Sequence, residues 1–119
     1  MRSNFFQSEL VRGDIQEMVE LQQFCFRSAM NFMLLDPERK FEYFDALERL
    51  IEKQKVFYAR IELSDDPEAQ SVKETMKQGI IMLGATPDTR MQDMFDELLG
   101  KVAKFREDLK AKLEQDNGK

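Results

Sequence analysis

The sequence predicts an all-α protein of four helices, and three features of the chain lead to this prediction. Each of its three prolines follows a residue that caps helices, apolar residues recur at spacings of three and four, and no segment shows the two-residue alternation of a strand. A chain of 119 residues has the length of one domain and can bury a core without disulfides. We therefore expect a single helical domain, 1–119, with helices over 8–35, 37–63, 67–83 and 87–115.

The starts of the last three helices are predicted by one repeated capping pattern. An Asp or Thr side chain accepts hydrogen bonds from the first free amides, proline fits the first helical position, and an acidic residue favours the positive end of the helix dipole. The three segments with this pattern are Asp36-Pro37-Glu38, Asp66-Pro67-Glu68 and Thr86-Pro87-Asp88.

The helix expected over 8–35 carries its apolar residues on one stripe, and Ser8 is a candidate cap. Phe5 and Phe6 stand where a hydrophobic staple would lie. The only cysteine of the chain, Cys25, is read first as a small buried apolar residue. A reactive thiol is the alternative, but the chain has no histidine to activate it. The stripe is formed by Val11, Ile15, Met18, Cys25, Ala29 and Phe32.

A short turn at Leu35-Asp36 predicts that the first two helices form a long antiparallel hairpin. The second helix repeats the apolar spacing through Phe44, Leu47, Ile51, Tyr58 and Ile61. Gln22 and Gln54 interrupt the two stripes and are either register-setting polar residues or edge positions. The pairing would cluster aromatic residues at both ends of the hairpin: Phe24, Phe26 and Phe32 near Phe41 and Phe44, and Phe5 and Phe6 near Phe57, Tyr58 and Leu63.

The last two helices differ in length and in their apolar pattern. The short third helix should end at Gly84, a typical C-terminal cap. The long C-terminal helix has a nearly strict heptad repeat, which is typical of a bundle or coiled coil, although Gly100 weakens it by about 1 kcal/mol relative to alanine. The heptad positions are Met91, Phe95, Leu98, Val102, Phe105 and Leu109.

The second half of the first helix is apolar on almost every side. The segment from Phe24 to Leu35 contains few polar residues, and a helix of this kind must be covered on most faces. One hairpin partner covers one face, so we expect self-association, with a twofold dimer as the default. A monomeric four-helix bundle with a large core is the alternative.

Composition excludes several chemistries. Without histidine the chain lacks the commonest general base, the usual zinc ligand sets and the common di-iron carboxylate site. It also lacks a phosphate-binding glycine loop. The net charge of −5 disfavours nucleic acid, and the basic residues of 101–112 interleave with acidic ones as on a solvated helix face. No stretch reaches the ~20 apolar residues of a membrane span or resembles a signal peptide. We expect a cytoplasmic protein without cofactor, metal or enzymatic activity.

Two surfaces are candidates for binding a protein partner. The first is the methionine-rich region of Met76, Ile80, Ile81 and Met82, which could equally be core. The second contains Lys53, Tyr58 and Arg60, of which Tyr and Arg are over-represented at interface hot spots, and the acidic knob of Asp65 and Asp66.

The second of these segments also carries a family resemblance. The matching pieces are Phe5-Phe6-x-Ser8-Glu9, Leu50, Glu52-Lys53-Gln54-Lys55, Tyr58, Arg60 and Leu63-Ser64-Asp65-Asp66-Pro67-Glu68-Ala69. With them the chain resembles a small uncharacterised family, a domain of unknown function, from cyanobacteria and their phages. The resemblance implies a short helical protein and no catalytic residue or cofactor. We expect a protein-binding adaptor or regulator, with a structural assembly protein of a virion or scaffold as the alternative.

Overall fold

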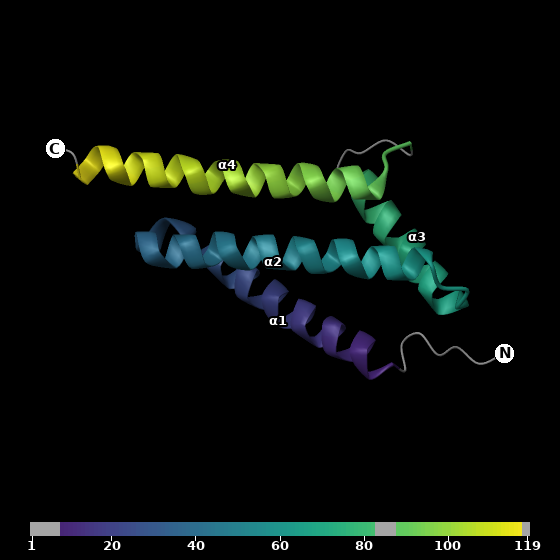
Figure 1. The fold of residues 1–119 in the computed structure, drawn as a ribbon. Coiled ribbons are helices and arrows are strands. Elements are labelled where there is room, and N and C mark those ends of the chain that lie inside the picture. Colours follow the sequence, from purple (N-terminus) through teal and green to yellow (C-terminus); the bar gives the residue numbers. More distant parts are fainter. Residues whose placement is uncertain (1–7, 83–87, 118–119) are drawn as a thin grey trace.

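The computed structural model describes residues 8–82 and 88–117, and this part of the chain is helical apart from short connections. It confirms an all-α fold with four α-helices and contains no strand among the described residues. A single 3-10 turn, η2, follows the first helix (Figure 1). The elements are α1 (Glu9–Met30), η2 (Phe32–Leu34), α2 (Pro37–Glu62), α3 (Pro67–Met82) and α4 (Met91–Asn117).

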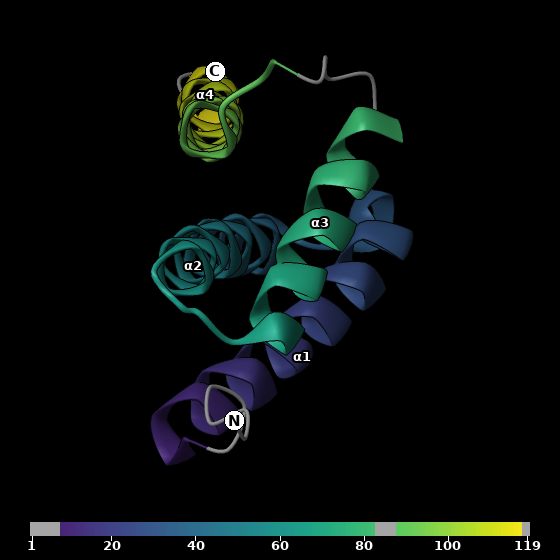
Figure 2. The ribbon, with the colours of Figure 1, turned by 90° about the vertical axis from the view of Figure 1, so that its right-hand side faces the viewer.

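The central element is α2, against which each of the other three helices makes its main contacts. α1 forms a hairpin with α2, α4 lies along the other side of α2, and α3 crosses near the end of α2 (Figures 1 and 2). The molecule is elongated, with extents of 66 × 32 × 20 Å. α1 and α4 both pack on α2 and make few contacts with each other.

Two of the three predicted proline starts are confirmed by their capping geometry. The Asp36 carboxylate accepts a hydrogen bond of 2.9 Å from the Arg39 amide, and α2 begins at Pro37. The Asp66 carboxylate accepts one of 2.9 Å from the Glu68 amide, and α3 begins at the next residue after Asp66. The cap satisfies amides that have no partner within the helix.

The predicted start of the last helix is wrong by four residues. α4 begins at Met91, and Asp88 lies in a turn before it. Met91 is the first heptad residue and is buried against α2, so the helix begins where its packing begins. Thr86 and Pro87, like the predicted cap at Gly84, lie outside the described residues.

The predicted end of the first helix is also wrong. α1 stops at Met30 and gives way to η2, instead of continuing to residue 35. The Asn31 side-chain amide donates to the Arg27 carbonyl over 3.0 Å, and Asn31 itself leaves the helical backbone conformation. Such local side-chain bonds compete with the helix ladder. At the other end Ser8 is the residue before the helix, but its side chain makes no capping hydrogen bond.

Two clusters of buried residues form the core, one on each side of α2. The α2–α4 cluster consists of Phe44, Ile51, Tyr58, Met91, Phe95 and Val102. The cluster between α1, α2 and α3 consists of Val11, Phe57, Ile61 and Ala69. Ile61 and Ala69 are fully buried. One cluster holds α4 on α2 and the other holds α1 and α3 on α2, and Met76 of α3 packs against both.

Cys25 is buried, which confirms its interpretation as a small apolar residue. Burial raises the pKa of its thiol, so the thiol stays protonated at neutral pH. Phe32 lies against Tyr43 and Phe44, as the predicted aromatic cluster at the turn of the hairpin requires. Phe26, from the same predicted cluster, is instead exposed. The opposite cluster involves Phe5 and Phe6, which lie outside the described residues.

Candidate functional site

An apolar groove of about 600 Å³ lies between the end of α1, the first half of α2 and the second half of α4. Its floor is formed by Tyr43, Phe44 and Leu47 of α2. These positions are three and four residues apart, so they lie on one face of the helix. Phe44 is buried, whereas Tyr43 and Leu47 are half-buried and line the open surface.

The wall on the α1 side is formed by Ala29, Phe32 and Met33. The 3-10 turn brings Phe32 onto α2, where its ring meets that of Tyr43 edge-on with 5.7 Å between centroids. The same turn leaves Met33 86% exposed at the mouth of the groove. The early end of α1 therefore shapes this wall.

The opposite wall is a stripe of α4 with Phe105 and Leu109 as its apolar residues. The ring of Phe105 stacks on that of Phe44, with 6.4 Å between centroids, yet 53% of Phe105 remains exposed. Figure 1 shows the C-terminal end of α4 extending past the start of α2. The heptad stripe of α4 thus continues beyond the helix that could cover it.

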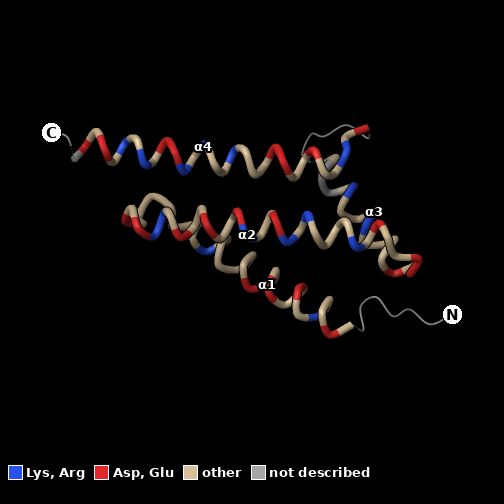
Figure 3. Tube along the Cα trace, viewed as in Figure 1, with Lys and Arg blue, Asp and Glu red and all other residues tan. Residues whose placement is uncertain are grey.

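Only three charged side chains line the groove. Lys40 lies on the α2 side, its ammonium nitrogen 5.0 Å from the centre of the Phe32 ring, in a cation–π arrangement. Asp108 and Lys112 lie on α4. Figure 3 shows that charges of both signs are spread along every helix. The groove is therefore apolar inside and has a mixed rim.

Arg106 holds the α4 wall in place. Its guanidinium donates to the Glu48 carboxylate and to the Asp45 carboxylate, each over 2.7 Å. The hydrogen bond with Glu48 is the main reason that the pKa of Arg106 is raised. Lys55 pairs with Asp96 farther along the same two helices. α4 is thus fixed to α2 by ion pairs beside the apolar contacts.

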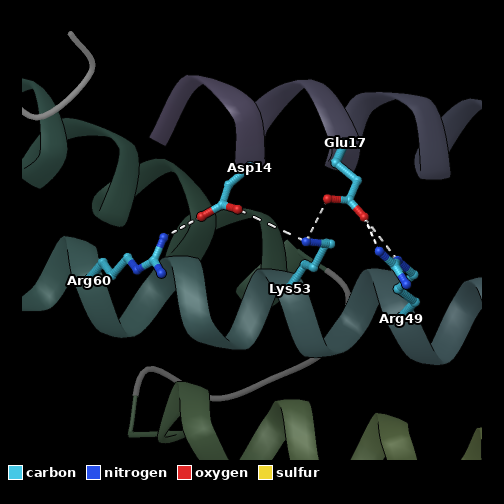
Figure 4. Close-up of polar contacts among 5 residues, drawn as sticks. All are labelled: Asp14, Glu17, Arg49, Lys53 and Arg60. Carbon is cyan, nitrogen blue, oxygen red and sulfur yellow. Dashed lines mark hydrogen bonds and ion pairs between the residues drawn. The ribbon is translucent and has the colours of Figure 1, made fainter. Parts of the chain in front are cut away.

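A second ionic network joins α1 to α2 (Figure 4). Lys53 lies between two carboxylates of α1, with its ammonium 2.8 Å from Glu17 and 4.0 Å from Asp14. Arg49 also donates to Glu17, and Arg60 to Asp14. Asp14 and Glu17 therefore each contact two basic residues of α2, which fixes the register of the hairpin.

The pKa of Glu17 is lowered from its ordinary value by hydrogen bonds from Lys53 and then Arg49. A carboxyl whose pKa is lower in the folded state stabilises the fold above its ordinary pKa, and this contribution is lost as the pH falls through the folded-state pKa. As the pH falls from about 5, the free energy of unfolding of Glu17→Gln should therefore decrease less than that of wild type. Denaturant unfolding at a series of pH values measures this.

The matched control for this acid dependence is Glu20→Gln. Glu20 lies on the same helix and forms no ion pair among the residues that the structure describes. Its variant should keep the acid dependence of wild type. If both variants follow the wild-type curve, Glu17 does not have the lowered pKa that its contacts imply.

The structure separates the residues that the sequence singled out. Lys53 and Arg60 lie in the α1–α2 ionic network. Tyr58 is 2% exposed and packs edge-to-face on Phe95, so it is a core residue rather than a surface residue. Asp66 caps α3, and the neighbouring Asp65 is exposed. None of these residues lines the groove.

The structure describes two side chains of the methionine-rich region, those of Met76 and Ile81. Met76 is half-buried and packs against both core clusters, which favours its core interpretation. Ile81 is also half-buried. The side chains of Ile80 and Met82 lie outside the described residues.

Sequence reasoning missed the groove-lining residues of α2 and α4 as a site. The signals were the apolar second half of the first helix, which was interpreted as a self-association surface, and the long heptad stripe, which was interpreted as a face of a bundle or coiled coil. Which stripes remain open depends on the placement of α1 and α4 around α2. The missed residues are Ala29, Phe32, Met33, Lys40, Tyr43, Leu47, Phe105, Asp108, Leu109 and Lys112.

Over 8–82 and 88–117, no group of three or more cysteine, aspartate or glutamate side chains is placed to hold a metal ion. Within the same ranges, no helix combines the length and apolar character needed to cross a membrane.

The fold and the groove define an all-α protein built on one central helix, with an open apolar groove on its surface. The chain belongs to the family described as Domain of unknown function (DUF1825), whose model matches residues 3–109. This confirms the resemblance to an uncharacterised family. Comparison with curated proteins and with solved structures gives no match.

Proposed function

We propose that this chain is a non-catalytic protein-binding module, an adaptor or regulator, in a cyanobacterial or cyanophage setting. Its groove binds the apolar face of a partner helix. The observation that carries this proposal is the open groove itself, about 600 Å³ in volume and lined mainly by aromatic and aliphatic side chains. Amphipathic helices bind in grooves of this kind through residues at helical spacing.

The shape of the groove supports a helical occupant. Its walls are helices and its floor is α2. A further helix would complete the packing around α2, because its side chains would fit between those of the groove. Phe105 supplies a half-exposed aromatic ring, the type of residue that commonly contributes most to binding energy. Such a contact gains its free energy from removing apolar surface from water.

The chemistry of the lining supports binding rather than catalysis. Tyr43 is a polar group of the floor, and burial raises the pKa of its phenol, with a smaller effect from Cys25. A phenol with a raised pKa stays protonated at neutral pH and does not serve as a base there. Apolar side chains make up most of the remaining lining.

Binding in the groove is tested by a pull-down from a cyanobacterial lysate, in which the proteins retained by full-length wild type and by its variants are compared. Phe105→Glu places a charge in the groove and should reduce retention of a specific partner by at least tenfold, about 1.4 kcal/mol. Quantitative mass spectrometry of the retained proteins measures this. Because Phe105 is 53% exposed, the substitution should leave the helices intact.

The matched control is Leu63→Glu, at an exposed residue that follows α2 at the end remote from the groove. It should retain the partner as wild type does. If wild type, Phe105→Glu and Leu63→Glu all retain the same lysate proteins, binding through the groove is contradicted.

A further inference from the structure

We infer that the partner in the groove is a second copy of this chain, which inserts the end of its own α1–η2 segment. This inference rests on the proposed function of the groove as a protein-binding site and names its occupant. The inserting surface, called the apolar tip below, consists of Phe26, Met30, Met33 and Leu34. Each copy would contribute its tip to the groove of the other around a twofold axis.

The apolar tip is the most exposed apolar surface near the groove. Phe26 and Met30 are 67% and 72% exposed, and Leu34 is 86% exposed. Phe26 and Met30 are four residues apart and lie on one face of α1, and Leu34 ends the η2 turn that follows. A partner helix lying only in the groove would leave this surface uncovered, whereas a second copy covers groove and tip in one contact.

The positions of tip and groove permit a closed dimer. Met33 belongs to both, because it is part of the tip and also lines the groove. A twofold interface uses the same patch on both copies, so tip and groove must both belong to that patch. Their closeness lets one compact patch contain both.

The exposed area suits a stable interface. The four tip side chains and Phe105 are each more than half exposed. Large apolar side chains of this kind carry on the order of 150–250 Å² each, so these five expose roughly 700 Å². Each partner of a standard stable interface contributes about 800 Å². The half-buried residues of the groove supply the remainder.

The charges around the contact are compatible with self-association. Arg27 is the only charged residue of the segment 26–35, and Asp108 is the only acidic residue that lines the groove. Neither forms an ion pair with another described residue. Insertion of the tip brings a cation of one copy and a carboxylate of the other into the same interface. The net charge of −5 is spread over the whole chain and is screened over about 10 Å in ordinary salt.

The first experiment measures the mass of the full chain by light scattering and sedimentation over a concentration series. Wild type should be a dimer, and Met30→Glu should raise the dissociation constant by at least tenfold. Leu63→Glu, at a residue 87% exposed and remote from the tip, should leave it unchanged. Circular dichroism checks that all three chains are equally helical. A monomeric wild type, open-ended larger particles, or equal weakening by both substitutions would overturn the inference.

A second experiment tests the pairing of tip with groove. Met30→Glu damages the tip and leaves the groove lining intact, whereas Phe105→Glu damages the groove and leaves the tip intact. A mixture of these variants retains one undamaged tip–groove contact per dimer. In the mixed dimer both charges fall in one tip–groove contact, which a single charge already breaks, whereas either variant with itself has both contacts broken. The mixed pair should therefore associate at least tenfold more tightly than either variant with itself. Equal association in the mixture and in the separate variants would overturn tip insertion.

The two proposals fail in different ways. If wild type is monomeric and Phe105→Glu still loses a lysate partner that Met30→Glu retains, the groove binds another protein and the dimer is rejected. If wild type is dimeric through the tip and groove but Phe105→Glu retains every lysate partner, the dimer stands and binding of a different protein in the groove is rejected.

Discussion

Phe95→Ala lowers the free energy of unfolding by about 3–5 kcal/mol, the usual cost of truncating a buried phenylalanine. Phe95 is 3% exposed and lies in the core cluster between α2 and α4, where its ring meets Tyr58 with 6.1 Å between centroids. Alanine removes the transfer free energy of the ring and leaves a cavity that the flanking helices cannot fully close. Equilibrium denaturation in urea measures the loss.

The matched control is Phe105→Ala, at the same residue type on the same helix. Phe105 is 53% exposed, so its truncation should lower the free energy of unfolding by about 1 kcal/mol or less. The measurement is made at a protein concentration at which the chain is monomeric. Equal losses for the two variants would show that α4 does not pack on α2 through Phe95. The contrast separates the part of the heptad stripe that forms the core from the part that lines the groove.

Ile61→Ala should lower the free energy of unfolding by about 2–5 kcal/mol. Ile61 has no exposed surface and lies in the second core cluster with Val11, Phe57 and Ala69. This cluster is where α3 packs on the hairpin, so amide exchange of α3 should accelerate more than that of α4. Urea denaturation and hydrogen exchange measure the two effects.

Val56→Ala is the control for Ile61, because Val56 lies on the same helix and is 51% exposed. Its truncation should cost well under 1 kcal/mol. Exchange in α4 that accelerates as much as exchange in α3 would contradict the assignment of Ile61 to the cluster that holds α3.

The fold was predictable where local chemistry decides it. Capping by Asp36 and Asp66 before proline depends on neighbouring residues only, and both predicted starts agree with the structure. The apolar spacing also identified the buried stripe of α2, including Phe44, Ile51 and Ile61. These features follow from the helical repeat and from hydrogen-bonding groups a few residues apart.

The predictions that failed depended on packing. The end of α1 at Met30 and the start of α4 at Met91 are set by where the chain meets α2 and by the side chain of Asn31. Tyr58 was placed both in the apolar stripe of the second helix and in a candidate binding surface. It packs against α4 and is buried, so the stripe assignment is confirmed and the surface assignment is wrong. Sequence spacing gives the face of a helix but does not say which neighbour will cover it.

The sequence by itself determined a helical protein with capped helix starts, a long hairpin and more apolar side chains than its four helices obviously cover. Only the tertiary structure decided which of these side chains are left open, because α1 and α4 both use α2 as their main partner and thereby leave a groove between them. The physical reason is that local hydrogen bonding and helical periodicity are encoded over a few residues. The covering of an apolar face depends instead on the position of helices that are distant in the sequence.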